Sequence, residues 1–274
     1  MFGLPALSSA CKTLATWVDQ AVFQPSLSVH VHRAFRYSSK RLYLYAIAAH
    51  SKTGSKTDAC APSEAKNMIN LLCCLLSLVA VVSGLLWMVP AKKRKPQACQ
   101  YFGRLTFLTV QSNVLLTLYH ALRYINPDSY ISIHAYPYAF AAGVGLTVNY
   151  YGLDHFLPEK IAEDRRWIEK GYAMIPIANH LEHGLALPTA LLDAFYGGHA
   201  GQCTLRDVLV FVGGYTTFYN LFQVANKRLT GAWLYPVFYE AEAAVGPRWA
   251  FWAVAMPVSL FYCGLGALAL AAAR

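Results

Sequence analysis

The residues best suited to chemistry lie in one short block, Asn-His-Leu-Glu-His at positions 179–183. Asn179 and His183 are four residues apart, so on an α-helix they share a face. His180, three residues before His183, can also converge on it, and Asp193 follows ten residues later on roughly the same side. An imidazole can take a proton from a neighbouring hydroxyl, while an amide or an acid orients the ring. The block therefore indicates a hydrolytic site, provided that a hydroxyl lies opposite it.

A stripe of polar side chains in an upstream apolar segment can supply that hydroxyl. Its members are spaced three, four, four and three residues apart and so share one helical face: Thr106, Thr109, Asn113, Thr117 and His120. A second interpretation is that the stripe only makes hydrogen bonds between helices, as Thr and Asn often do in membrane bundles. The histidine block, likewise, can be a buried polar network that fixes helix register.

Metal and haem sites fit these positions less well. Glu182 points about 200° around a helix from His180, so the acid and the two histidines do not all reach one ion. The two histidines also lack the spacing of four residues that the HExxH zinc motif requires. His120 and His183 can face each other as two haem ligands, but no second such pair occurs. We therefore expect no metal and no cofactor.

The segments that carry these residues are apolar enough to lie in a membrane. Hydrophobic residues make up 56% of the 274-residue chain, and the mean hydropathy is +0.34. Charged residues make up 14%, against about 25% in a soluble domain, which argues against a soluble enzyme and against disorder. Six stretches approach the roughly 20 apolar residues that cross a bilayer, namely 68–90, 105–125, 133–153, 171–196, 208–224 and 249–273. We predict an all-α bundle of six transmembrane helices.

Basic residues outside these stretches predict the topology. The loops after the first, third and fifth stretches hold twelve Lys or Arg, against six on the opposite side. Because basic loops tend to stay in the cytosol, we place the Lys-Lys-Arg-Lys loop at 92–95 there and both termini on the far side. The net charge of +9 is thus assigned to topology and not to nucleic acid.

The ends of the chain differ in composition. Residues 1–67 hold eight basic residues and three acids, and we interpret them as a largely unstructured basic extension, disordered or for targeting. The membrane domain then spans 68–274. The seven cysteines contain no CxxC motif, so they indicate neither a disulfide framework nor a zinc site.

Three blocks in this order resemble a known family. Leu105-Thr106-Phe107 opens the second stretch, and the histidine block continues to Pro188 and Asp193. The last block reads Thr-Gly-x-Trp-x-Tyr-Pro and comprises Thr230, Gly231, Trp233, Tyr235 and Pro236. Together, over residues 68–274, they resemble the androgen-induced, or FAR-17a-like, family of multi-pass membrane proteins. Glu182 is an acid that we would not expect in the family's histidine block.

The resemblance implies a membrane threonine hydrolase of long-chain fatty acyl esters, such as fatty acid esters of hydroxy fatty acids. It places the catalytic histidine on His183 and the catalytic threonine on Thr106 or Thr109. We expect Asn179, His180 and Asn113 to orient the ring or to bind the oxyanion. We expect the substrate pocket to include Asp193, His120, Trp233 and Tyr235. The partners are then a lipid ester and the bilayer, in the endoplasmic reticulum, another endomembrane or the plasma membrane.

The competing interpretation is a multi-pass transporter, or a non-catalytic structural membrane protein with a buried polar network. Transporters often show internal repeats and broken helices. No repeat relates residues 68–150 to 171–274, whereas Pro176 and Pro188 flank the histidine block and can break its helix. A hydrolytic site requires the second and fourth helices to touch, with His183 close to Thr106 or Thr109.

Overall fold

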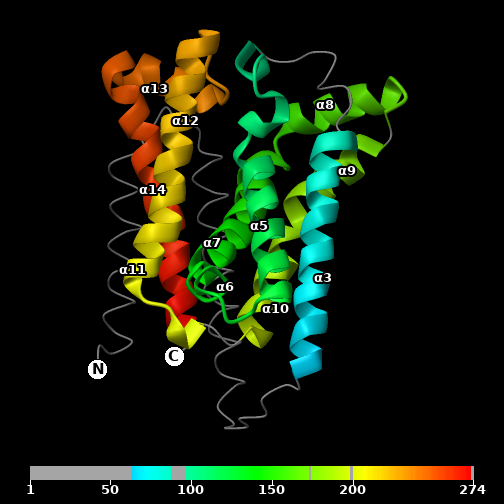
Figure 1. Ribbon diagram of the computed structural model, residues 1–274. Helices are drawn as coiled ribbons and strands as arrows, with labels where there is room; N and C mark the ends of the chain where they lie inside the picture. Colours follow the sequence, from blue (N-terminus) through cyan, green and yellow to red (C-terminus); the bar gives the residue numbers. More distant parts are fainter. Residues whose placement is uncertain (1–62, 88–96, 173, 198–199, 273–274) are drawn as a thin grey trace.

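The fold is helical throughout the described chain. A computed structural model describes residues 63–87, 97–172, 174–197 and 200–272, and in these ranges it contains helices and no strand. The predicted all-α class is thus confirmed. The helices lie side by side as a bundle (Figure 1). Residues 1–62 of the predicted extension lie outside the described residues, and so does the basic loop at 92–95. The first described helix begins at Ser63, within the predicted extension of 1–67.

In the six predicted stretches, most of the described residues are helical. In chain order the elements are α3 (Ser63–Val82), η1 (Ser83–Trp87), η2 (Gln97–Cys99), η3 (Gly103–Thr106), α5 (Leu108–Ile125), α6 (Tyr130–His134), α7 (Tyr136–Asn149), η4 (Tyr150–Asp154), α8 (Pro158–Glu169), α9 (Met174–Gly184), α10 (Ala186–Tyr196), η5 (Ala200–Gln202), α11 (Leu205–Asp207), η6 (Val208–Gly213), α12 (Gly214–Thr230), α13 (Pro236–Val245) and α14 (Pro247–Ala272). The short helices α8 and α13 were not predicted, and both lie at the same end of the bundle (Figure 1).

Three helical stretches are long and apolar enough to cross a membrane by length and composition. They are Lys66–Leu85, Leu205–Thr230 and Pro247–Ala271 among the described residues. Their outward faces carry large apolar side chains, such as Leu75 and Leu221, that are more than half exposed. Such faces suit lipid as the surrounding solvent. The remaining crossings of the predicted bundle stay a prediction.

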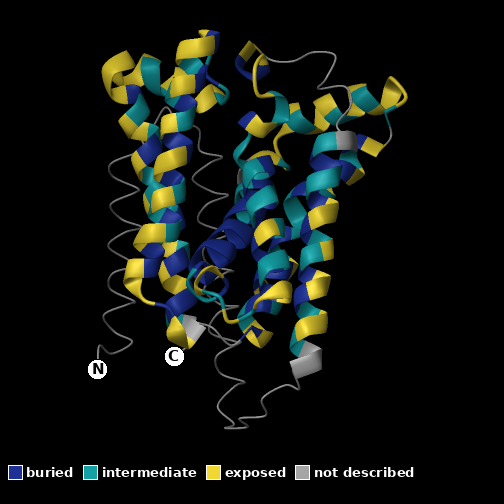
Figure 2. Cartoon of the chain, viewed as in Figure 1, coloured by how far each residue is buried: buried dark blue, intermediate teal, exposed yellow. Residues whose placement is uncertain are grey.

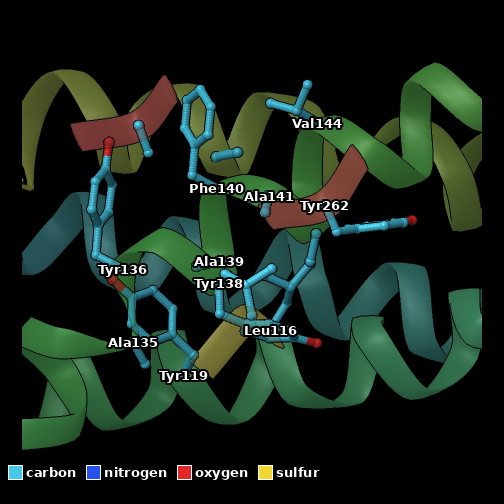
Figure 3. Close-up of a cluster of buried hydrophobic side chains, with 14 of the residues drawn as sticks. Leu116, Tyr119, Ala135, Tyr136, Tyr138, Ala139, Phe140, Ala141, Val144 and Tyr262 are labelled. Carbon is cyan, nitrogen blue, oxygen red and sulfur yellow. The ribbon is translucent and has the colours of Figure 1, made fainter. Parts of the chain in front are cut away.

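The core of the bundle surrounds α7. Its residues 136–147 are all buried, and the helix shows as a dark blue segment in the middle of Figure 2. A helix that is apolar on every side is buried on every side. Figure 3 shows its side chains Phe140 and Val144 in one cluster with Leu116 of α5 and Tyr262 of α14. This central helix is the frame against which α5 and α9 are placed.

The second predicted helix starts later than expected. It was predicted from residue 105, but Phe107 is extended (φ −78°, ψ 135°) and α5 begins only at Leu108. Before it, Gly103 has a φ of 55°, a conformation that favours glycine, and the Thr106 hydroxyl donates to the Gly103 carbonyl at 2.8 Å. Thr106 therefore belongs to η3, and the assignment of Thr106 to the helical stripe was wrong.

The fourth predicted helix is two helices. The α9 segment ends at Gly184 and α10 begins at Ala186. Pro188 explains the break, because it has no N–H to donate to Gly184 and its ring crowds that carbonyl. The sequence had left open that Pro188 breaks this helix, and the structure shows that break. As a result, the ten-residue spacing between His183 and Asp193 no longer describes one face.

Candidate active site

Thr109 and His183 face each other across the contact between α5 and α9. The Oγ1 atom of Thr109 lies 3.3 Å from Nε2 of His183. The other ring nitrogen, Nδ1, lies 2.9 Å from the backbone carbonyl of Asn179. Because a carbonyl oxygen only accepts, this second bond requires the proton to be on Nδ1. The lone pair of Nε2 then points at the Thr109 hydroxyl, as a general base requires.

Two residues outside α5 and α9 also contact His183: Thr147 of α7 and Tyr150 of η4. The ring of Tyr150 stacks on the imidazole with the centroids 4.1 Å apart and the planes 13° apart. The Thr147 hydroxyl donates to the backbone carbonyl of His183 at 2.7 Å. Sequence reasoning missed both residues, and no spacing signal marks them. They become neighbours of His183 only because α7 and η4 pack against α9.

The start of α5 is held by α12 and by the Thr-Gly-x-Trp-x-Tyr-Pro segment at 230–236, here called the Tyr-Pro block. The Leu108 amide donates to the Tyr235 hydroxyl at 3.1 Å. The first amides of a helix have no partner within it, so Tyr235 caps the turn that carries Thr109. The carbonyl of Thr106 accepts from the Tyr219 hydroxyl and from Gln223 Nε2, both at 3.0 Å. Tyr235, predicted for the substrate pocket, thus contacts the backbone beside Thr109.

The rest of the Tyr-Pro block forms the turn that brings Tyr235 to this place. Gly231 ends α12 with a φ of 75°, which lets the chain reverse. Trp233, also predicted for the pocket, is buried; its indole N–H donates to Glu242 at 2.8 Å and its ring stacks on Phe238. Trp233 therefore anchors the turn.

The three predicted orienting residues have different positions. Asn179 orients His183 through its backbone carbonyl, while its buried side-chain Nδ2 has no hydrogen-bond partner. Asn113 donates from Nδ2 to the Glu182 carbonyl at 2.7 Å. His180 is exposed, and its Nδ1 lies 2.8 Å from the Tyr151 hydroxyl. Asn113 and Asn179 thus support the His183 turn, whereas His180 lies on another side of α9.

His120 and Asp193 lie in a separate buried region. Asp193 forms an ion pair with Arg123 and accepts from the Tyr119 hydroxyl at 2.9 Å. His120 is fully buried, and neither ring nitrogen has a hydrogen-bond partner. At 1.5 Å per residue, the backbone of His120 is about 16 Å along α5 from that of Thr109. The structure therefore does not bring these two predicted pocket residues to the Thr109–His183 contact.

The match to known proteins covers this whole arrangement. A sequence model of FAR-17a/AIG1-like proteins matches residues 69–268, which is more than half of the chain and includes Thr109 and His183. The chain belongs to the FAR-17a/AIG1-like family. No curated protein and no solved structure matches it. This membership and the three long apolar helices make it a membrane protein, and the family is compatible with a hydrolase.

One further charged pair lies beside the site of this FAR-17a/AIG1-like protein. Glu182, next to His183, is buried and pairs with Arg104 of η3 at 2.9 Å. Sequence reasoning noted Glu182 without a role and did not single out Arg104. In the described segments, no three His, Cys, Asp or Glu side chains converge as a metal site. The arrangement offers a hydroxyl, an imidazole with a fixed tautomer and a buried amide, which suits acyl transfer.

Proposed function

We propose that this family member is an integral-membrane hydrolase of long-chain fatty acyl esters, with Thr109 as nucleophile and His183 as general base. The observation that carries the proposal is the 3.3 Å contact between Thr109 Oγ1 and His183 Nε2. A free Thr hydroxyl is a weak nucleophile, and an adjacent base is what activates it. The Asn179 carbonyl takes the place that a carboxylate has in a Ser-His-Asp triad, since it fixes the tautomer of the ring.

The reaction proceeds in two acyl transfers. Thr109 Oγ1 attacks the ester carbonyl carbon while its proton passes to His183 Nε2. The tetrahedral oxyanion collapses, the C–O bond to the alcohol breaks, and the leaving oxygen takes the proton from Nε2. Water then attacks the acyl-threonine ester with His183 again as base, which releases the fatty acid and restores the Thr109 hydroxyl.

Asn179 is our candidate for the oxyanion. Its side-chain Nδ2 is buried and has no hydrogen-bond partner, which is costly for an amide unless a ligand completes it. Asn179 lies one turn before His183 on the same face of α9. A developing negative charge on the ester oxygen can accept from this amide, and such donors lower the barrier most when they are fixed in advance.

The position of the site favours a lipid substrate. Thr109 lies in the first turn of α5, at the end of the bundle that carries α8 and α13 (Figure 1). Large exposed apolar side chains, Phe102 and Leu105, lie just before it. An ester with its carbonyl near the headgroups and its acyl chains in the hydrocarbon can therefore reach Thr109 from one leaflet. We expect an endomembrane, such as the endoplasmic reticulum, or the plasma membrane.

Thr109, and not Thr106, is the proposed nucleophile. The Thr106 hydroxyl donates to the Gly103 carbonyl, and its residue is fully buried within η3. The Thr109 hydroxyl is half-buried and faces the imidazole. The two threonines thus divide the tasks, since Thr106 shapes the turn that Thr109 follows.

The test uses the full chain purified in lipid nanodiscs, with a fluorophosphonate probe and a p-nitrophenyl ester of a long-chain fatty acid. Thr109→Ala and His183→Ala should remove labelling and lower turnover by at least about 1,000-fold. Thr117→Ala is the matched control, because it is the same substitution on the same helix and the Thr117 hydroxyl donates to the Asn113 carbonyl. Full turnover in both the Thr109 and His183 variants would overturn the proposal and favour a transporter or a structural protein.

A further inference from the structure

Glu182 places a carboxylate in the interior of the membrane domain, one residue before the proposed base. It is 1% exposed, and a charge in such a place is costly unless an opposite charge lies beside it. Arg104 supplies that charge: its Nη2 lies 3.0 Å from Oε1 and 2.9 Å from Oε2 of Glu182. The guanidinium also lies 5.1 Å from the centre of the Phe107 ring. The acid is therefore held as a paired carboxylate.

A glycine closes the other side of this carboxylate. Gly84 lies in η1, and a Cβ added there would be 2.7 Å from Oε1 and 2.8 Å from Cδ of Glu182. Real Cβ atoms do not approach other heavy atoms so closely, so a side chain at Gly84 would force Glu182 to move. Arg104 and Gly84 thus enclose the Glu182 carboxylate from two sides.

The backbone of the same turn is held by two other helices. The Glu182 carbonyl accepts from Asn113 of α5, and the His183 carbonyl accepts from Thr147 of α7, both at 2.7 Å. The last carbonyls of a helix have no partner within it, and α9 ends at Gly184. This turn would otherwise fray where the chain breaks before α10. Its geometry therefore depends on contacts from outside α9.

We infer that the Arg104–Glu182 ion pair is a positioning device for the reaction of Thr109 with His183; this inference rests on the proposed function. Arg104 lies on the η3 turn that leads into α5, five residues before Thr109. Glu182 lies in the last turn of α9, next to His183. The pair thus ties the segment that carries the nucleophile to the turn that carries the base.

The contact between the two reactive groups has little tolerance for movement. Thr109 Oγ1 and His183 Nε2 are 3.3 Å apart, and a hydrogen bond is effectively lost beyond about 3.5 Å. A displacement of about 1 Å in a reacting group can cost about 100-fold in rate. The hydrogen bonds between Arg104 and Glu182 join the two side chains to each other and not to Thr109 Oγ1 or His183 Nε2, so we assign the pair to positioning.

The test compares four variants at or beside the pair in the full chain in nanodiscs. Glu182→Gln keeps the shape and removes the charge, and Arg104→Gln removes the partner. Gly84→Ala keeps both charges and displaces the carboxylate. For each we expect kcat for the p-nitrophenyl ester to fall about 10- to 100-fold with KM little changed. Arg104→Lys, which keeps the charge, should retain more kcat than Arg104→Gln.

Glu163→Gln is the matched control. This glutamate lies on α8 and pairs at 3.5 Å with Lys160, and its side chain is 48% exposed. The same change of an acid to its amide should leave kcat at the wild-type value, because the Glu163 side chain is exposed and far from η3 in sequence. The thermal unfolding of each variant is measured alongside, so that kcat is expressed per folded molecule.

The outcomes separate the two proposals. Full activity in Thr109→Ala and His183→Ala would overturn the hydrolase and the positioning role together. If those two variants are inactive but folded Glu182→Gln and Arg104→Gln keep the wild-type kcat, only the positioning role is wrong. A lower folded yield with unchanged kcat per folded molecule overturns it as well. If Glu182→Gln does not fold, Gly84→Ala decides: a lower kcat supports the inference and an unchanged kcat overturns it.

Discussion

Two arginine–carboxylate pairs, each with a buried acid, mark the two ends of α5. At its start, Arg104 meets Glu182 of α9; near its end, Arg123 meets Asp193 of α10. Each carboxylate has a glycine beside it at which a Cβ would collide with the acid. The two pairs are thus alike in chemistry and in local packing. Their surroundings differ, and this difference decides what each pair does.

The pair at the far end is enclosed by structural partners. Both side chains are 2% exposed, Tyr119 donates to Asp193, and Arg123 Nη2 donates to the Gly197 carbonyl at 3.1 Å. Asn70 of α3 also bonds the Arg123 backbone. This pair joins three helices and contacts no proposed reactive group. The Arg104 side chain is 15% exposed, and its partner Glu182 directly precedes His183. In our inference the Arg104–Glu182 pair therefore sets the position of His183 relative to Thr109.

Removal of Arg123 should have the largest effect on stability. Arg123→Ala leaves the Asp193 carboxylate buried without a counter-charge, and we expect a loss of about 3–5 kcal/mol in the free energy of unfolding. The measurement is denaturant unfolding in detergent micelles followed by tryptophan fluorescence. The double variant Arg123→Leu with Asp193→Leu removes both charges and should lose less. A folded Arg123→Ala with the reduced kcat expected of Glu182→Gln would show that both pairs influence the reaction.

Replacing Gly84 or Gly197 with alanine tests whether the two ends of α5 differ in function. In Gly197→Ala, the new Cβ would lie 2.3 Å from the Asp193 backbone oxygen, 2.6 Å from Asp193 Oδ1 and 2.8 Å from Arg123 Nη1. We expect a loss of about 1–3 kcal/mol in stability and no change in kcat per folded molecule. Gly84→Ala should instead lower kcat. Equal loss of kcat in the two variants would show that the ends of α5 are not functionally distinct.

The sequence predicted the parts of this comparison that depend on local spacing. Apolar stretches located the helices, and spacing placed the Thr stripe and the histidine block each on one helical face. The family resemblance then pointed to His183 with Thr106 or Thr109. The fold class is confirmed, whereas the catalytic roles stay a proposal. Sequence spacing works for these features because helical periodicity places residues three or four apart on one face.

The rest depends on contacts between distant segments and on helix breaks. The late start of α5 follows from Gly103 and an extended Phe107. The break after Gly184 follows from Pro188, which the sequence had marked as able to break the helix, but its effect on Asp193 was not predicted. Because of that break, Asp193 does not share a face with His183, and it forms an ion pair with Arg123 instead. Tyr150, which stacks on His183, comes from a segment with no motif of its own. Contacts such as that of Tyr150 with His183 arise from the packing of helices around α7, and the periodicity within one helix cannot predict them.

A third pair, at the exposed end of the bundle, should show the smallest effect. Lys227 and Trp233 both bond Glu242, and the side chains of Lys227 and Glu242 are 31% and 22% exposed. These hydrogen bonds, first that from Lys227, lower the pKa of Glu242 below its ordinary 4.5. Solvent screens such a pair, so Glu242→Gln should cost at most about 1 kcal/mol at neutral pH.

The pH dependence of that small effect has a definite sign. Because the pKa of Glu242 is lower in the folded chain, its contribution is complete above the ordinary value of 4.5 and disappears as the pH falls through the lowered folded value. Unfolding of wild type and Glu242→Gln should therefore differ at pH 7 and converge in acid. If the difference at pH 7 is as large as that of Arg123→Ala, the contribution of the pairs to the free energy of unfolding does not follow their burial. A difference that persists in strong acid would mean that Glu242 acts through packing, because no charge then remains on it.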